Sequence, residues 1–218
     1  MSTLLLGTDA QPVRDLARAL GAELVVVPDV DGAPGHDGTD WAWADALEAW
    51  RTEAAAGPAT GAVVVAAWTG DLGAPTPLDD LDLGGWVARH EVAFGRWFAA
   101  LGVAAARCGD HGAIVAVVDK AAPLDCAGRA AETGVADAVE ALARSLARSE
   151  GPRGVRVNTV TTPVRLTSPP VVLPAPPLAT FPGTIAVEVA GAVRTLLGRD
   201  AVGITATTVH ADSGRTGH

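Results

Sequence analysis

The side chains best suited to covalent or metal chemistry are scarce in this sequence. Cys108 and Cys126 are the only cysteines, and their spacing is not that of a metal-binding pair. Two thiols without a secretory signal indicate a reducing compartment, so we expect a cytoplasmic protein; a disulfide between them is the alternative. The sequence contains no tyrosine and a single asparagine, Asn158. We therefore predict no metal site, and proton donation by a phenol is excluded.

Composition and charge narrow the class of protein further. The chain has 218 residues, of which 49% are hydrophobic and 19% are charged, and this is typical of one globular domain. We expect that domain to span residues 1–218 and to end in a short flexible tail. The net charge of −9 and the lack of a Lys/Arg-rich run argue against nucleic acid and anionic membranes as partners.

Short β-branched runs alternate with longer segments of helical periodicity. In the segment 129–149, Val135, Val139, Leu142 and Leu146 form one apolar stripe. We predict strands at 3–6, 24–27, 62–67, 113–118, 155–160 and 203–210. We predict helices at 12–20, 39–55, 84–106, 129–149 and 185–197, and a proline-rich loop at 168–183. The alternation predicts an α/β fold with a single doubly wound, Rossmann-like parallel sheet and helices on both faces.

Two segments in the C-terminal half resemble a known family. Residues 142–158, LARSLARSEGPRGVRVN, match the family's helix, tight turn and following strand, and Pro163 stands where the family has a proline. Residues 203–214, GITATTVHADSG, are similar to its closing strand. On these residues the chain resembles the short-chain dehydrogenases/reductases, especially the 3-oxoacyl-carrier-protein reductases. The resemblance implies a Rossmann-like fold, and in intact members it implies NAD(P)-dependent reduction of acyl or polyketide-type substrates.

The cofactor loop of that family is poorly preserved. The family has TGxxxGxG after its first strand, because glycines let the backbone approach a pyrophosphate at a helix N-terminus. In the corresponding stretch only the first glycine, Gly7, is present. Gln11 and Val13 add side chains where the backbone must come close, and Pro12 removes an N–H donor. Asp9 adds a charge that repels phosphate. We therefore expect no bound cofactor, with NAD(P) as the alternative.

Three further features concern the cofactor pocket. Asp29 ends the second predicted strand, where an NAD enzyme of the family has a ribose-binding acid; a solvated loop aspartate is the other interpretation. The family's NNAG motif is replaced by AAWTG at 66–70, so Trp68 either fills the adenine or ribose space or is an ordinary core residue. Residues 30–39 leave room for a loop only, so we expect one helix–strand unit after the second strand to be missing. Gly7 and Asp29 are then remnants of a cofactor site.

The family's catalytic set is also absent. Counting back from Asn158 places the family's tyrosine at Glu132, its lysine at Ala136 and its serine at Asp119. In the family, the tyrosine donates a proton, while the lysine lowers the tyrosine's pKa and holds the nicotinamide ribose. Ala136 can do neither, and Glu132 donates a proton only if burial keeps it protonated. We therefore expect no catalytic residues, and Asp119 and Glu132 are the remaining candidates.

The leading hypothesis is a catalytically degenerate protein that serves as a non-catalytic structural or regulatory subunit. In the family, two long helices pack against their counterparts in another subunit, and here the segments 84–106 and 129–149 remain apolar. The first of them carries four aromatic residues, Trp86, Phe94, Trp97 and Phe98. We expect the partner to be a second copy or an active short-chain reductase. The alternative is that these aromatic side chains fill the core of the monomer.

Two enzymatic hypotheses stand beside it. Asp119 and Glu132 would lie in one site, and two adjacent carboxylates can share a proton and catalyse a non-redox dehydration or isomerisation. His90 and Lys120 are further candidates by their position in the sequence. The other hypothesis is an atypical NAD(P)-dependent reductase of acyl or polyketide-type substrates with a different proton donor. Two carboxylates exposed to solvent and pointing apart would remove the first of these hypotheses.

Overall fold

The computed structural model describes residues 2–30, 41–68, 73–165, 178–179 and 183–217. The strands are β1 (Thr3–Gly7), β2 (Glu23–Val26), β3 (Thr60–Ala66), β4 (Cys108–Asp119), β5 (Arg156–Thr162) and β6 (Thr208–His210). The α-helices are α1 (Gln11–Leu20), α2 (Ala42–Ala55), α3 (Leu83–Trp86), α4 (Val92–Arg107), α5 (Ala130–Glu150) and α6 (Ala190–Leu197). No helix within the described ranges is long and apolar enough to cross a membrane.

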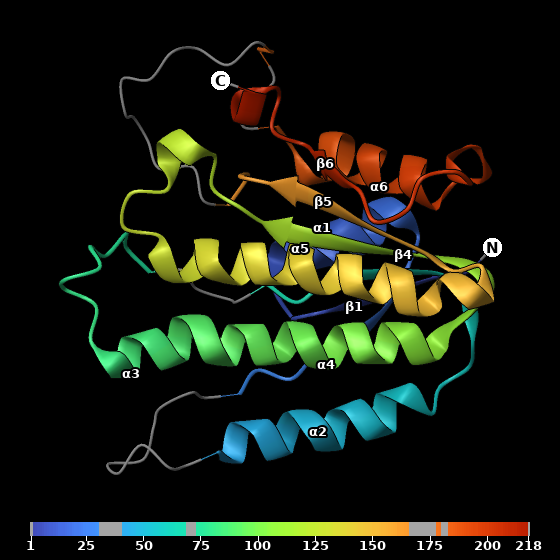
Figure 1. Cartoon of the computed structure of the whole chain (residues 1–218), viewed down its shortest axis with the longest axis horizontal. Coiled ribbons are helices and arrows are strands. Elements are labelled where there is room, and N and C mark those ends of the chain that lie inside the picture. The colour runs from blue at the N-terminus through green and yellow to red at the C-terminus, as the bar shows by residue number, and fades with distance from the viewer. Residues whose placement is uncertain (1, 31–40, 69–72, 166–177, 180–182, 218) are drawn as a thin grey trace.

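All of these strands join one parallel sheet. Their order is β2-β1-β3-β4-β5-β6, and every neighbouring pair is parallel. The chain moves outward from β1 to β2, returns past β1 to β3 and continues to β6 at the other edge (Figure 1). This is the doubly wound arrangement, in which a switch in strand order falls beside β1. The predicted fold class is confirmed.

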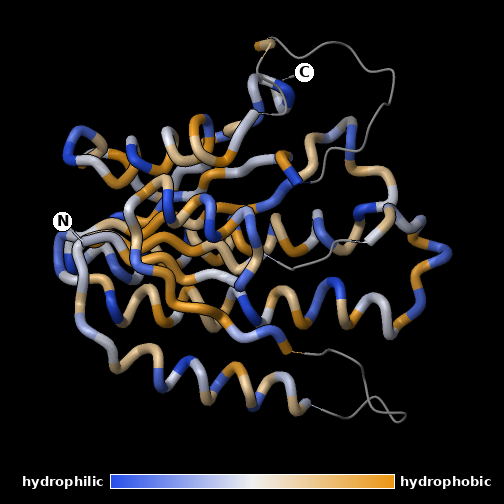
Figure 2. Tube along the Cα trace, turned by 180° about the vertical axis from the view of Figure 1, so that it is seen from behind, coloured by the Kyte–Doolittle hydropathy of each residue, from blue (hydrophilic) through white to orange (hydrophobic). Residues whose placement is uncertain are grey.

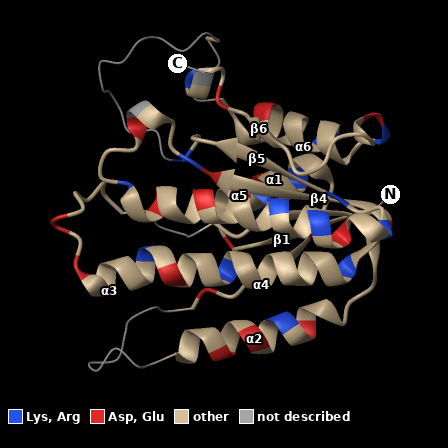
Figure 3. Ribbon diagram, in the orientation of Figure 1, with Lys and Arg blue, Asp and Glu red and all other residues tan. Residues whose placement is uncertain are grey.

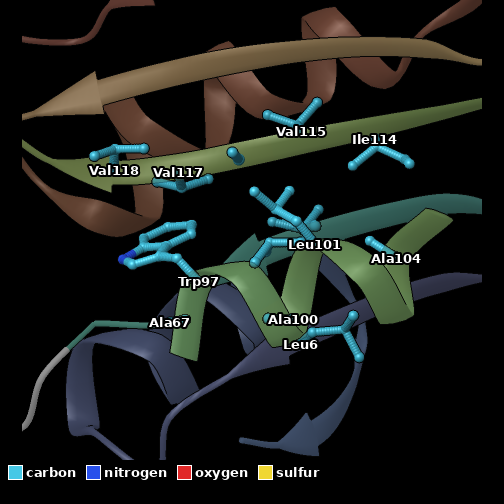
Figure 4. Packing of buried hydrophobic residues seen from close by; sticks show 14 of the residues in the cluster. Leu6, Ala67, Trp97, Ala100, Leu101, Ala104, Ile114, Val115, Val117 and Val118 are labelled. Atoms are coloured by element: carbon cyan, nitrogen blue, oxygen red, sulfur yellow. The ribbon is translucent and has the colours of Figure 1, made fainter. Parts of the chain in front are cut away.

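Helices cover both faces of the sheet. Helices α2, α4 and α5 lie side by side over one face, and α1 and α6 pack together on the other (Figure 1). Because both faces are covered, the central strands are apolar on both sides: Val63, Val64 and Val65 of β3 are all fully buried. Figure 2 shows these apolar runs in the middle of the molecule. In Figure 4, Leu101 of α4 and Ile114 of β4 belong to the same packed core.

The predicted helix 84–106 is divided into three parts. Its first turn, α3, begins after Asp82, whose carboxylate accepts a hydrogen bond from the Gly85 N–H at 2.7 Å. A π-helical turn, Val87–Glu91, then connects α3 to α4. A π-helical turn holds one more residue than an α-helical turn, and such turns are frequent at functional sites. The turn changes which side chains face the sheet, an effect that an average helical period does not predict.

The ends of several elements differ from the prediction. The predicted strand 203–210 is reduced to β6, because Ala206 has a φ of 58° and cannot continue an extended strand. A second π-helical turn, Ile185–Val189, replaces the first part of the predicted helix 185–197. The predicted start of α2 at 39–40 and most of the predicted loop 168–183 lie outside the described residues.

The edge of the sheet at β2 agrees with the expected loss of a helix–strand unit. The next described element after β2 is α2, which packs against α4. Within the described ranges no strand pairs with the outer side of β2. The wall that a further strand and helix would build next to β1 and β2 is therefore not formed by any described element.

The C-terminal residues are held more firmly than the expected loose tail. The carboxylate of Asp212 accepts hydrogen bonds from the backbone N–H groups of Gly214 at 2.9 Å and Thr216 at 2.7 Å. Arg215 is buried and pairs with Asp125 at 2.8 Å. These contacts connect the C-terminal segment to the turn that follows β4.

Both cysteine thiols are free, so the disulfide alternative is wrong. Cys108 is buried at the start of β4, and burial raises the pKa of its thiol to about 11. Cys126 donates a hydrogen bond from its Sγ to the carbonyl oxygen of Pro123 at 3.0 Å. A thiol with so high a pKa is a poor nucleophile at neutral pH, so Cys108 is a packing residue.

Candidate functional site

Asp119 and Glu132 meet at one small cavity. Asp119 is the last residue of β4, and Glu132 lies in the first turn of α5. The connection between them, residues 120–129, includes a 3-10 turn at Pro123–Asp125 and returns the chain to the end of the strand. Both residues line a cavity of about 30 Å³, which we call the carboxylate cavity. Such a volume has room for a water molecule or two. The two positions therefore come together as the resemblance implied, and neither side chain points freely into solvent.

Asp119 is buried beside an arginine. Its side chain is 11% exposed, that of Arg165 is 10% exposed, and the guanidinium nitrogen lies 2.8 Å from the carboxylate. Neither carboxylate oxygen of Asp119 has a well-formed hydrogen bond to a described residue. Burial raises the pKa of Asp119 to about 7, although the charge of Arg165 acts to lower it. Asp119 therefore gains and loses its proton near neutral pH.

Glu132 is held by two arginines. Arg89, on the π-helical turn, donates from Nε and Nη2 to Oε1 of Glu132 at 3.0 and 2.5 Å. Arg129 Nη1 lies 3.6 Å from the same oxygen. The side chain of Glu132 is only 9% exposed. Two arginines therefore hold the Glu132 carboxylate in place. A general acid must instead direct a proton toward a substrate, so these contacts argue against that role for Glu132.

Two tryptophan side chains close the carboxylate cavity. Trp68 and Trp97 are both buried and both line it. The indole Nε1 of Trp68 donates to the carbonyl oxygen of Val117 at 2.7 Å, and Arg165 lies 5.3 Å from the centre of its ring. Figure 4 shows Trp97 of α4 beside Val117 at the end of β4. Trp68 is therefore a core residue that also fills space next to Asp119.

Lys120 does not belong to the carboxylate cavity, so its candidacy is wrong. Its Nζ lies 2.7 Å from a carboxylate oxygen of the exposed Asp137 and 2.6 Å from one of the buried Glu140, both on α5. Lys120 follows Asp119 directly, and successive residues of a strand point to opposite sides. Ala136, which the count from Asn158 aligned with the family's lysine, is fully buried and contributes only a methyl group.

His90 also lies apart from the carboxylate cavity. Its ring packs edge-on against Trp86 with 4.4 Å between the ring centres, and it lines a separate cleft between α2 and α4. Burial lowers the pKa of His90, while the charges of Glu91 and Glu132 act to raise it. Since the ordinary pKa of histidine is already below 7, His90 is mainly neutral at neutral pH.

Gly7 is explained by packing. A Cβ atom at this position would lie 2.6 Å from Cγ1 of Val13 and 2.9 Å from the carbonyl oxygen of Ala66. The glycine thus lets β1, β3 and α1 approach each other closely. Its presence does not require a bound pyrophosphate.

Side chains occupy the N-terminus of α1. Arg14 forms an ion pair with Asp9 and donates to Oε1 of Gln11 at 3.2 Å. The N-cap residue, Ala10, has no side chain that could cap the helix, and Pro12 lies in the first turn. The end of the helix that would face a pyrophosphate is therefore surrounded by a local network of charged and amide groups.

Asp29 forms a structural ion pair. Its carboxylate accepts a hydrogen bond from Arg96 of α4, which is buried and also donates to the carbonyl oxygen of Val30 at 2.9 Å. The Asp29 side chain is itself 85% exposed. The contact joins the segment that follows β2 to α4. Of the two interpretations of Asp29, an exposed loop aspartate fits this geometry better than an acid that is free to bind a ribose.

Three arginines were not predicted as site residues. Arg89, Arg96 and Arg165 each pair with an acid that the sequence comparison singled out. Two of these pairs join residues 43 and 67 positions apart. An arginine within a mostly apolar helix, such as Arg96, was the available signal, because a buried charge needs a partner. Among the described residues, no group of three or more His, Cys, Asp or Glu side chains could hold a metal ion.

Comparisons with known proteins agree with this architecture. No protein-family model matches the sequence, and no curated protein matches it significantly. A double variant of a short-chain dehydrogenase/reductase from Serratia marcescens has a TM-score of 0.70 at 20% identity, covering 99% of this chain and 98% of that one. An acetoin dehydrogenase from Salmonella typhimurium has a TM-score of 0.69 at 18% identity, covering 100% and 98%.

A third similar structure contains a cofactor. It is a blue fluorescent protein from a metagenomic library in complex with NADPH, with a TM-score of 0.66 at 19% identity over 98% of this chain and 97% of that one. The protein described here therefore has the fold of the short-chain dehydrogenases/reductases, as its C-terminal segments predicted.

Proposed function

We propose that this protein is a degenerate short-chain dehydrogenase/reductase that has lost the redox chemistry and acts as a non-catalytic subunit. The carboxylate cavity carries the proposal. By the count from Asn158, Asp119 and Glu132 correspond to the family's serine and tyrosine, and the cavity that both line measures about 30 Å³. Ligand sites usually enclose about 300–1,000 Å³. A nicotinamide ring and a substrate need roughly tenfold more space than these side chains leave.

The nucleotide-binding end of the fold supports the same proposal. Asp9, Arg14 and Gln11 surround the N-terminus of α1, and Asp29 is engaged by Arg96. A cofactor would have to displace these ion pairs and would meet the negative charge of Asp9 and Asp29. Breaking each ion pair costs free energy, whereas a glycine-rich loop binds the cofactor without breaking such pairs.

Calorimetric titration with NADH and NADPH tests the loss of cofactor binding. We expect no binding of either nucleotide tighter than about 1 mM, which corresponds to about −4 kcal/mol. The blue fluorescent protein found in complex with NADPH serves as the positive control under the same conditions. A dissociation constant in the micromolar range would contradict the proposal and favour an atypical reductase.

We further propose that association uses the outer surfaces of α4 and α5. On α4, Phe98 is 55% exposed, whereas Trp97 is buried and Phe94 is half-buried, so the aromatic residues divide between surface and core. On α5, the exposed Ala141 lies on the solvent side of the helix. Ala141 and Ser145 contribute small side chains to this face, between the charged Asp137 and Arg144, so another helix can approach closely there. The partner is a second copy or an active short-chain reductase.

A single substitution on α5 tests this surface. We expect Ala141→Arg to reduce the molar mass in sedimentation from a multiple of the 21.9 kDa chain to that of one chain. Arginine is a good helix former, so the variant keeps its fold while its side chain obstructs helix–helix packing. Ala49→Arg, an equally exposed position on α2, is the matched control. A wild-type chain that is already monomeric contradicts self-association and leaves the reductase as the partner to test.

One observation favours acid/base chemistry as a second function. The pKa of Asp119 is about 7, and Asp119 shares the carboxylate cavity with Glu132, which is the pairing that proton transfer requires. The size of the cavity confines such chemistry to water or to a substrate that opens it. A dehydration or isomerisation that disappears in Asp119→Asn would establish this function.

A further inference from the structure

A second hollow lies on the helical face of the molecule, between α2 and α4. Its volume is about 560 Å³, which is within the usual range of small-molecule sites. Aromatic and aliphatic side chains form most of its lining, including Trp43 and Leu47 from α2 and Phe94 and Phe98 from α4. We call this hollow the α2–α4 cleft. It is nearly twenty times larger than the carboxylate cavity and shares none of the residues that line it.

The packing of α2 on α4 builds the cleft. Leu47 is buried between the helices, and the ring of Trp43 lies directly over Gly95. A Cβ atom on Gly95 would come within 2.5 Å of that ring, so the glycine allows the indole to form one wall. Further along, the side chain of Arg51 lies beside Gly102. The cleft is thus formed where large side chains meet glycines, and Phe98 remains 55% exposed at its border.

The charges around the cleft have one sign. Asp45, Glu48 and Glu91 line it, and none of the described residues that line it is a lysine or arginine. Glu48 is paired with Arg51 at 2.6 Å, whereas neither Asp45 nor Glu91 has an ion pair with any described residue. His90, the remaining titratable residue of the lining, adds no full positive charge at neutral pH. Figure 3 shows acidic residues on α2 and on the π-helical turn that precedes α4.

Aromatic walls with unpaired carboxylates select a particular class of ligand. The faces of Trp and Phe rings attract cations, and the attraction increases when the cation is removed from water. Carboxylates at the border add favourable Coulomb energy for a cation and unfavourable energy for phosphates, nucleotides and acyl carboxylates. We propose that the α2–α4 cleft binds a small organic cation, such as a quaternary or tertiary ammonium compound with an aromatic or short aliphatic body.

This inference is independent of the proposed function. It requires neither redox chemistry nor its loss, because the cleft is separate from the carboxylate cavity. It shares Phe98 with the proposed association surface, but Asp45 and Glu91 can be neutralised without changing the exposed face of α5. A failure of either idea is therefore visible by itself.

Calorimetric titration with benzyltrimethylammonium chloride tests the proposal. We expect saturable binding that is at least about tenfold tighter than binding of the neutral benzyl alcohol, in line with about 1–2 kcal/mol for a cation on aromatic rings. Benzoate, the anionic counterpart, is expected not to bind. Raising the salt concentration should weaken binding of the cation and leave benzyl alcohol unaffected.

Substitutions assign the binding to the cleft. Phe98→Ala removes an exposed ring and should weaken binding of benzyltrimethylammonium about tenfold without changing the melting temperature. The double variant Asp45→Asn/Glu91→Gln should weaken binding of the cation by a similar factor, so that its affinity comes close to that of benzyl alcohol. Glu23→Gln removes an exposed carboxylate from β2, away from the cleft, and is the matched control that should bind like the wild type.

Three results would overturn the proposal. The first is the absence of saturable binding up to about 10 mM to both the wild type and Ala141→Arg, which corresponds to less than about 3 kcal/mol. The second is equal affinity for the cation and for benzyl alcohol. The third is equal weakening of cation binding by Glu23→Gln. The titration is repeated on Ala141→Arg. Binding to that variant alone, with none to the wild type, would show that a second copy of the chain fills the cleft in the native protein.

Discussion

Trp68→Ala is expected to lower the free energy of unfolding by about 3–5 kcal/mol, because it removes a large buried ring and leaves a cavity. Trp68 is 2% exposed, and its indole N–H is bonded to the carbonyl oxygen of Val117. The substitution also removes the ring against which Arg165 packs. Urea denaturation followed by far-ultraviolet circular dichroism measures the change as a shift in the midpoint at constant slope.

Two comparisons make this result specific. Trp41→Ala removes an exposed tryptophan, 57% accessible, and should change the free energy of unfolding by no more than about 0.5 kcal/mol. Trp68→Phe keeps most of the volume but leaves the carbonyl oxygen of Val117 without its indole donor, so we expect a smaller loss of about 1–3 kcal/mol. A Trp68→Ala variant as stable as Trp41→Ala would mean that the ring is not packed beside Asp119.

The second large effect is a dependence of stability on pH that comes from Asp119. Its pKa is raised from 3.8 to about 7 in the folded protein, because burial disfavours the charged carboxylate. Between these two values the folded chain binds a proton that the unfolded chain has released, so stability falls as pH rises. The contribution is greatest below pH 4 and is lost by about pH 7. It amounts to at most ~4 kcal/mol, at about 1.4 kcal/mol for each pH unit.

Comparison of the wild type with Asp119→Asn isolates the contribution of Asp119 to the pH dependence of stability. Asparagine does not titrate. The free energy of unfolding of the wild type should therefore fall relative to that of Asp119→Asn as the pH rises from 4 to 7. Asp79→Asn, which changes an exposed acid, controls for the overall charge of the chain. A difference that stays constant over this range would show that Asp119 is not buried in its protonated form.

Local sequence patterns were sufficient for the fold, and the resemblance to the family supplied the positions of the candidate site. The stripe of Val135, Val139 and Leu142 predicts α5 because burial on one side of a helix repeats every 3.6 residues. The uniformly apolar 113–118 predicts a strand covered on both faces. Asp119 and Glu132, which the resemblance placed in one site, line the same carboxylate cavity at the end of β4 and the start of α5. The inferences about the helix and the strand depend on residues close together in the sequence.

What the sequence by itself determined is therefore the parallel sheet, the order of its helices, and the absence of the tyrosine and lysine that the family's chemistry needs. Only the tertiary structure decided that Arg165 pairs with Asp119, that Lys120 turns to α5, and that Trp43 and Phe98 border an acidic cleft. The physical reason is that a charge buried in the fold takes its partner from any element packed beside it. That choice depends on distances in space, which a local pattern of residues does not contain.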